Sequence, residues 1–411
     1  MAKFEIVNDE IDEIDELEEA IYDVGIEVIG VGGGGGNALE YMAKNGIDGV
    51  EYIVVNTDVP ALKSKDKRLM RRLQIGKKKT KGRGAGGNPE VGCESAQEDR
   101  EEIVKMLEGA TMAFISAGMG GGTGTGAAPV IAEISKEMGI LTIGVVTKPF
   151  DFERQQKMNT ALKGIVEMRK HVDALIIIPN QKLLTINEKA INIKSAFEMV
   201  DDVLYKVVKS ISDVLNNTSY INVDFSDLET ILKDSGDAHI AIGEATGDNK
   251  VEEAVMQIVN SPLLETSINN AGKMLVHITM SDDGLLEDVE EVGAKLTAAA
   301  HPDVEIITGC ELSSETKDTI TVTVVATSFR DDNSGIAKQE QMPGSMKSQY
   351  KSEPIDKGST QQLRDARSTF FTDSTNTASR AEPLDKFITQ NLEAGNTDDD
   401  PYQALEEIFR K

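Results

Sequence analysis

The segment Gly118–Gly126 reads Gly-Met-Gly-Gly-Gly-Thr-Gly-Thr-Gly. It follows the apolar run Met112–Ala117 and precedes the helix-like stretch Ala127–Met138. A loop with so few side chains exposes its own backbone amides, and the dipole of the helix behind it favours a bound anion. The hydroxyls of Thr123 and Thr125 add two further donors. This order of strand, glycine loop and helix predicts a phosphate site in an α/β fold.

A second glycine loop, Gly32–Gly36, ends in Asn37 and reinforces this interpretation. It directly follows the apolar run Ile26–Val31 and precedes the helical stretch Ala38–Asn45. Strand, glycines and helix form the phosphate-binding unit of nucleotide folds. We therefore expect both loops to contact the phosphates of one nucleotide.

The glycines Gly30, Gly32 and Gly35 also satisfy the G-x-G-x-x-G spacing of dinucleotide-binding folds, with Glu51 or Asp58 as the acidic residue that follows. An NAD-binding Rossmann oxidoreductase is therefore an alternative. The second loop argues against it, because a single Rossmann half-site has no use for another phosphate cradle. The P-loop motif G-x-x-x-x-G-K-[ST] does not occur in the sequence.

Composition excludes several classes of protein. The formal net charge is -27, whereas a nucleic-acid binder needs clustered Lys and Arg. Only Cys93 and Cys310 are present, which favours a reducing cytoplasm over a disulfide framework. No apolar run approaches the ~18 residues of a membrane-spanning helix. We expect no nucleic acid as partner and no direct membrane insertion.

The hydrophobic pattern divides the chain into six segments. Five apolar runs between residues 26 and 178 alternate with amphipathic stretches, which predicts a parallel sheet covered on both faces. The proposed segments are an acidic flexible arm (1–25), a nucleotide-binding domain (26–193), a long central helix (194–216), a smaller α/β domain (217–329), a disordered linker (330–383) and a tail peptide (384–411).

Basic residues gather between Lys63 and Arg83 in this otherwise acidic chain. A solvated loop is the favoured interpretation, and contact with a neighbour's acidic arm or with the phosphates is the alternative. The four histidines, His171, His239, His277 and His301, are scattered along the sequence. Their spacing favours structural roles, and it predicts no metal site beyond Mg²⁺ carried with a nucleotide.

Several ordered segments give the chain a specific resemblance. The region from Ile26 to Phe329 resembles the FtsZ family, the tubulin-like bacterial cell-division GTPases, and Gly118–Gly126 resembles the tubulin signature. The resemblance implies a tubulin-like α/β fold with a GTP-binding domain, a central helix and a GTPase-activating domain. The matching segments are Ile29–Asn37, Val55–Asp58, Gly84–Gly92, Gly118–Pro129, Val146–Phe150, Ile178–Asn180 and Asn222–Asp227.

This resemblance also implies which residues bind GTP. Glu153 matches an acid near the ribose, and Lys157 stands where the family usually has Arg, which keeps the charge but loses the planar fork. Phe197 and Asp201 match the pair that faces guanine, one by stacking and one by accepting from its N–H donors. The full set is Gly33, Gly34, Gly35, Gly36, Asn37, Asn56, Gly121, Gly122, Thr123, Gly124, Thr125, Glu153, Lys157, Asn180, Phe197 and Asp201.

Asp224, Asp227 and Asn222 are the implied catalytic residues. In the resembling family the two carboxylates polarise the attacking water at the nucleotide of the adjacent subunit. Acids three residues apart at a helix start are otherwise usually capping and dipole partners. Ser219 stands where the family usually has Gly, so the entry to this loop departs from the pattern.

The implied function is that of a GTP-dependent polymerising GTPase that forms the cytokinetic ring. Its cofactors would be GTP or GDP with Mg²⁺. Copies of the chain would associate with one another in head-to-tail filaments. Membrane-tethering and regulatory division proteins would bind the tail at 384–411, in the cytoplasm at midcell. A noncatalytic GTP-binding scaffold is a further alternative.

Overall fold

The computed structural model describes residues 25–184, 192–215, 224–261, 263, 268–281, 284–313 and 318–329. A 10-stranded sheet runs through them in the order β3-β2-β1-β4-β5-β6-β7-β10-β8-β9. Its strands are β1 (Ile26–Val31), β2 (Val50–Asn56), β3 (Arg71–Gln74), β4 (Met112–Gly118), β5 (Leu141–Lys148), β6 (Ala174–Pro179), β7 (Gly236–Thr246), β8 (Lys273–Ser281), β9 (Glu305–Ser313) and β10 (Thr319–Thr327).

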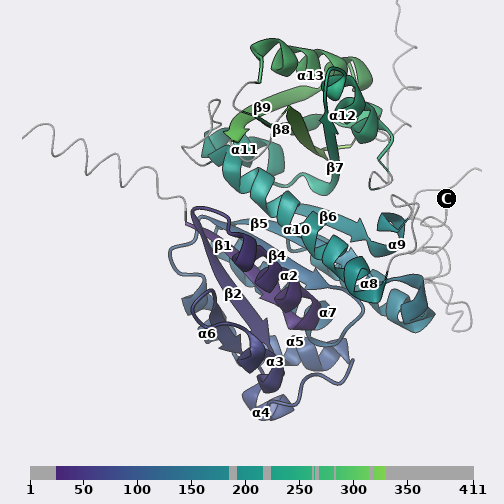
Figure 1. The fold of residues 1–411 in the computed structure, drawn as a ribbon. Coiled ribbons are helices and arrows are strands. Elements are labelled where there is room, and N and C mark those ends of the chain that lie inside the picture. The colour runs from purple at the N-terminus through teal and green to yellow at the C-terminus, as the bar shows by residue number, and fades with distance from the viewer. Residues whose placement is uncertain are drawn as a thin grey trace, which may run out of the picture. The chain divides into compact units, whose positions relative to one another are not determined.

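Helices connect these strands (Figure 1). No helix among the described residues is both long and apolar enough to cross a bilayer. The helices are α2 (Gly32–Asn45), α3 (Val59–Ser64), α4 (Lys77–Thr80), α5 (Pro89–Glu98), α6 (Arg100–Met106), α7 (Thr123–Glu137), α8 (Gln155–Arg169), α9 (Asn180–Leu183), α10 (Ile193–Leu215), α11 (Phe225–Leu232), α12 (Lys250–Val259) and α13 (Leu286–Ala299), with short 3₁₀ turns η1 (Asp151–Glu153) and η2 (Ile268–Asn270).

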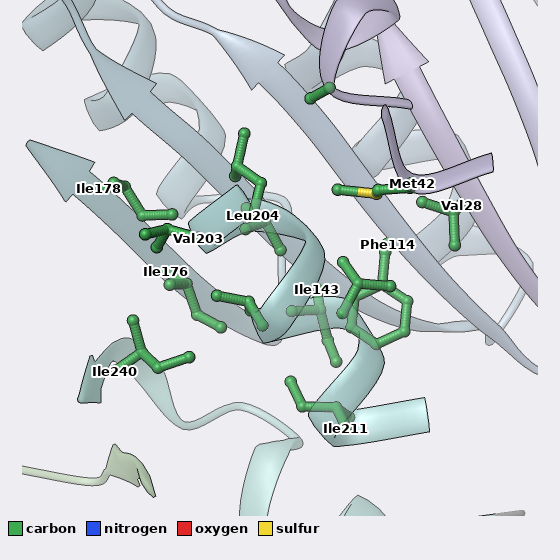
Figure 2. Close-up of a cluster of buried hydrophobic side chains, with 14 of the residues drawn as sticks. Val28, Met42, Phe114, Ile143, Ile176, Ile178, Val203, Leu204, Ile211 and Ile240 are labelled. Atoms are coloured by element: carbon green, nitrogen blue, oxygen red, sulfur yellow. The ribbon is translucent and has the colours of Figure 1, made fainter. Parts of the chain in front are cut away.

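Strands β1 to β6 are all parallel, and helices cover both of their faces. Because side chains alternate along a strand, each strand contributes to two separate apolar layers. One layer lies under α2 and α10, where Phe114 of β4 and Ile143 of β5 lie near Ile211 of α10 (Figure 2). The other layer lies under α5 to α8.

The second half of the sheet is joined to the first by β7. Only Ala174–Ile176 of β6 pair with Gly236–Ala238 of β7, in parallel. Strand β10 then pairs antiparallel with both β7 and β8, and β8 pairs parallel with β9. Helices α12 and α13 cover this half with a third apolar cluster. The sheet is therefore all parallel up to β7 and contains both parallel and antiparallel pairs beyond it.

The structure confirms the predicted strands and the long helix, and it corrects two expectations. The basic segment Lys63–Arg83 is not simply a solvated loop, because it contains edge strand β3 and helix α4. Helix α2 begins at Gly32 instead of Ala38, so the glycines form its first turns. The predicted arm, linker and tail peptide lie outside the described residues, and the six-segment division stays a prediction.

One helical glycine fixes the contact between α5 and α7. A Cβ placed on Gly126 of α7 would lie 1.9 Å from the carbonyl oxygen of Pro89. Gly293 of α13 has nothing within 4 Å of such a Cβ. An alanine side chain would therefore clash with backbone at position 126 and would enter open space at position 293.

We predict opposite effects on stability for these two substitutions. Gly293→Ala should raise the free energy of unfolding by up to ~1 kcal/mol, because alanine is the better helix former. Gly126→Ala should lower it by roughly 1–3 kcal/mol, because the backbone of α5 must move. Urea unfolding of both full-length variants measures the difference. Equal shifts of the midpoint in the same direction would contradict this packing.

Candidate functional site

The two glycine loops pack against each other backbone to backbone. Gly32 has a φ of +75°, and a Cβ on it would lie 2.7 Å from the amide nitrogen of Gly124. A Cβ on Gly35 would lie 2.3 Å from the carbonyl oxygen of Ser116. Side chains at these positions would push the first loop away from β4 and from the second loop. Space therefore requires glycine at both positions, and backbone conformation requires it at Gly32 as well.

Both loops end in helix N-termini that have no side-chain cap. Neither α2 nor α7 has a side chain that accepts from its first-turn amides. These amides are strong donors that need partners, and the two helix dipoles add positive potential at the same place. They border a cavity of about 640 Å³. Such a cavity is suited to an anionic ligand with several acceptor oxygens.

The structure brings most of the predicted nucleotide residues into this one cavity. Gly36 and Thr125 do not line it. Gly36 faces Val54, and the hydroxyl of Thr125 accepts from the Gly120 amide at 2.8 Å. Both residues therefore contact other parts of the protein and not the cavity. The predicted residues that line the cavity are Gly33, Gly34, Gly35, Asn37, Asn56, Gly121, Gly122, Thr123, Gly124, Glu153, Lys157, Asn180, Phe197 and Asp201.

Two buried polar atoms in the cavity wall have no hydrogen-bond partner among the described residues. They are Oδ1 of Asn180 and Oγ of Ser116. An unpartnered buried polar group costs free energy, so it is rare unless a ligand or water satisfies it. These atoms indicate that the cavity is built for a polar ligand.

A buried lysine holds Asn37 in place. The ammonium of Lys65 donates to Asn37 Oδ1 at 2.7 Å and to Glu40 Oε2 at 2.9 Å. Its side chain is only 8% exposed, and Glu40 supplies the compensating charge. Asn37 is thereby oriented at the end of the first glycine loop before any ligand arrives.

Glu153 of η1 and Lys157 of α8 line the cavity and form an ion pair with each other. The other carboxylate oxygen of Glu153 accepts from the Phe150 amide at 3.0 Å, which fixes the side chain at the turn before α8. The Glu153 side chain is more buried than that of Lys157. Lys157 therefore neutralises Glu153 and still borders the cavity.

The ring of Phe197 and the half-buried acid Asp201 line the cavity where α10 borders it. Phe197 is 41% exposed and packs edge-on against Phe150, with ring centroids 5.2 Å apart. Asp201 lies one helical turn further along α10. Burial raises the pKa of Asp201 to about 7, the charge of Lys65 lowers it and that of Glu198 raises it further. An exposed ring face beside an acid can bind a flat base with hydrogen-bond donors on its edge.

Sequence reasoning missed some residues of the cavity wall. Ser116 is a polar residue inside the apolar run of β4, and that interruption was its signal. Arg83 lies at the end of the basic segment Lys63–Arg83 and lines the cavity with Asp58, to which it is bridged by backbone pairing. The sequence shows that this segment is basic, but it does not show that Arg83 lines the cavity.

The predicted catalytic acids lie elsewhere. Asp224 and Asp227 flank the start of α11, both are exposed, and neither lines the cavity. The side chain of Asp224 makes no capping bond to α11. Helix α10 has 23 residues, about 34 Å of axis, and α11 lies beside its C-terminal end (Figure 1). Asn222 and Ser219 lie outside the described residues.

Comparison with protein families gives two matches that together cover most of the described chain. Residues 25–188 match the model of the Tubulin/FtsZ family, GTPase domain. Residues 236–330 match the model of the FtsZ family, C-terminal domain. The first match contains both glycine loops, and the second begins at β7.

Individual proteins agree with the family models. The cell division protein FtsZ of Pseudomonas aeruginosa is 48% identical over 303 residues, which cover 74% of this chain and 76% of that protein. The FtsZ of Buchnera aphidicola is 46% identical over 303 residues, 74% of this chain and 78% of that protein. A solved FtsZ dimer from M. jannaschii superposes with a TM-score of 0.73 at 36% identity, covering 84% of this chain and 100% of that one.

Proposed function

This chain belongs to the Tubulin/FtsZ family, and we propose that it binds GTP in the cavity between the two glycine loops and hydrolyses it where two copies of the chain meet. As a member of that family it is a polymerising GTPase of bacterial cell division, with guanine nucleotide as its ligand and itself as a partner. Neither the oxidoreductase nor the noncatalytic scaffold has support among the relatives.

The phosphates would bind at the two uncapped helix N-termini. Amides of Gly33–Gly35 and Gly121–Gly124 are the donors, and Thr123 adds a hydroxyl already bonded to Thr57 at 2.7 Å. Fixed amide dipoles need no reorganisation when charge develops on a transferred phosphoryl group. This pair of helix ends is the observation that carries the proposal.

The guanine base would lie between Phe197 and Asp201. An ionised Asp201 accepts from the N1–H and the exocyclic amine of guanine, which adenine does not offer as a pair. Asn180, with its unpartnered oxygen, and the Glu153–Lys157 pair would contact the sugar and the nearer phosphates. Each assignment uses a group that already faces the cavity.

We also propose Mg²⁺ carried with the nucleotide. Among the described carboxylates that line the cavity, Asp58 caps α3 and Glu153 pairs with Lys157. This wall fits an ion held chiefly by phosphate oxygens and water, which is how Mg²⁺ commonly binds at phosphate sites. When bound, the ion would neutralise phosphate charge.

Hydrolysis would require a second subunit. The acids Asp224 and Asp227 are exposed at the opposite end of α10 from Asp201, so one chain cannot bring them to its own phosphates. A head-to-tail contact places the acids of one subunit over the cavity of the next, and such a contact repeats into an open filament. There the carboxylates would orient or deprotonate the attacking water.

The tail residues 384–411 would recruit membrane-tethering and regulatory division proteins to a ring at midcell in the cytoplasm. Two short apolar clusters, Leu384–Ile388 and Tyr402–Phe409, stand there in a polar sequence. Short apolar motifs in such a setting commonly fold onto a partner groove. These residues lie outside the described structure, so their role rests on the sequence.

Base selection should depend on Asp201 and on pH. Asp201→Ala should weaken GTP binding by about 1.5–3 kcal/mol, roughly 10- to 150-fold, and ATP binding little. Because only the carboxylate accepts both guanine donors, wild-type affinity should fall roughly tenfold from pH 8 to pH 6, through the pKa of about 7.

The control for this experiment is Asp202→Asn, the adjacent acid of α10, which bonds the Tyr41 hydroxyl instead. Isothermal titration calorimetry measures the GTP affinity of each variant at pH 6 and pH 8. Any pH dependence that remains in Asp201→Ala comes from ionisation of the nucleotide phosphates and is subtracted from that of the wild type. Equal affinity of the wild type for ATP and GTP would refute the assignment of Asp201.

Catalysis between subunits should be recoverable from two inactive variants. Asp224→Ala keeps the cavity and should bind GTP and form persistent filaments without turnover. Gly33→Asp places a carboxylate at the phosphate end, where a Cβ meets nothing within 4 Å, so the fold should tolerate it. In the mixture, the intact cavity of the first faces the intact α11 of the second. Phosphate release measured on the mixture should exceed that of either variant.

Asp248→Asn, an exposed acid before α12, is the matched control and should leave turnover unchanged. Wild-type turnover per subunit should rise steeply with protein concentration past an assembly threshold. Constant turnover at dilutions where only monomers exist would exclude the shared site.

The tail assignment predicts a separation of functions. Truncation after Phe329 should leave GTP binding and assembly largely intact, because the cavity and α11 both lie upstream. Recruitment of the tethering protein should be lost, and a peptide of residues 384–411 should bind that protein in solution. Binding to residues 330–383 alone would overturn the assignment.

A further inference from the structure

A second polar cluster lies at the far end of α10 from the nucleotide cavity. Asp213 is two residues before the end of α10, His277 is in β8 and Glu311 is in β9. In the parallel register His277 pairs with Gly309, so Glu311 follows on the same face of the sheet. One ligand atom from each of the three side chains lies within 4.8 Å of the others.

The histidine of this cluster is buried without a partner. Its side chain is 3% exposed, and Nε2 has no hydrogen-bond partner among the described residues. The nearest carboxylate oxygen, Glu311 Oε2, is 3.9 Å from it, beyond hydrogen-bond distance. Burial, helped by the charge of Lys209, lowers the pKa of His277 to about 4. A buried ring nitrogen without a hydrogen-bond partner is available as a metal ligand.

A lysine supplies positive charge to the cluster. The ammonium of Lys209, one turn earlier on α10, lies 2.5 Å from Asp213 Oδ2. The Lys209 side chain is 37% exposed, whereas that of Asp213 is 8% exposed. Lys209 can therefore leave toward solvent, but Asp213 cannot. Two carboxylates beside one ammonium leave the cluster with excess negative charge.

We propose that Asp213, His277 and Glu311 bind a divalent transition-metal ion of the Zn²⁺ class, which displaces Lys209 and clamps α10 to β8 and β9. One imidazole nitrogen and two carboxylate oxygens suit this class of ion, and hard cations such as Mg²⁺ would prefer oxygen alone. Metal–ligand bonds of about 2.0–2.2 Å require the ligand atoms to draw together by roughly 1 Å. Three protein ligands leave the fourth position to water.

This site was not expected from the sequence, where the histidines are scattered and no metal-ligand spacing occurs. Its ligands come from a helix and two strands that meet only in the folded chain. Glu311 is 21% exposed and provides a route for the ion from solvent.

The experiment titrates Zn²⁺ into the full-length protein with GDP and excess Mg²⁺ present, so that the nucleotide site is filled. A competing fluorescent chelator reports the affinity. The wild type should bind a single tight equivalent, and His277→Asn should weaken it at least tenfold. His171→Asn removes a partly exposed histidine that lies beside Glu167 and should change nothing. Glu311→Gln, at a partly exposed position, provides a second ligand variant if His277→Asn fails to fold.

Lys209→Gln distinguishes a metal site from a simple ion-pair cluster. Removing the competing ammonium should tighten Zn²⁺ binding severalfold, and Zn²⁺ should raise the unfolding temperature of this variant more than that of the wild type. Unchanged or weaker binding in Lys209→Gln would overturn the proposal. So would equal Zn²⁺ affinity in the wild type, His277→Asn and Glu311→Gln.

Discussion

The close approach of two backbones is the constraint on which the nucleotide cavity depends. Gly32 against Gly124 and Gly35 against Ser116 leave no room for a Cβ. Because these contacts join the segments after β1 and β4, they place two uncapped helix N-termini side by side. Ligands of open α/β sheets bind where the strand order reverses, and β1 and β4 are the strands that flank that point here.

Local signals in the sequence predicted much of this arrangement. Buried parallel strands are continuous apolar runs, and glycine loops after them are readable without a partner structure. The edge strand β3 was missed because Arg71 and Arg72 lack the apolar signature of a central strand. The early start of α2 was missed because glycine is a poor helix former, and tertiary packing overrides that preference at Gly32. Ser116 was readable as a polar residue inside the apolar run of β4, whereas the position of Arg83 depends on the path of the segment after β3, which spacing does not encode.

The order of the first six strands also explains why a dinucleotide fold was a reasonable alternative. The order β3-β2-β1-β4-β5-β6 is the order of the Rossmann sheet. Two features depart from that fold: the second glycine loop after β4, and the continuation of the sheet through β7. The long helix α10 carries the side chains proposed to bind the base at one site and, beyond its end, leads to the acids proposed for another. The same strand order therefore occurs in folds with different functions. Here the second glycine loop and the strands added after β6 distinguish this fold from a dinucleotide-binding one.

The junction between β6 and β7 has a mechanical consequence. Three residue pairs join these strands, whereas β4 and β5 share seven. A pull applied from one end of this sheet to the other would have to cross that junction. Among the described strand pairs this one has the fewest paired residues, and apolar side chains of α10 share one cluster with residues of both β6 and β7. Side-chain packing therefore contributes a larger share of the cohesion at this junction than it does between β4 and β5, where backbone pairing is more than twice as long.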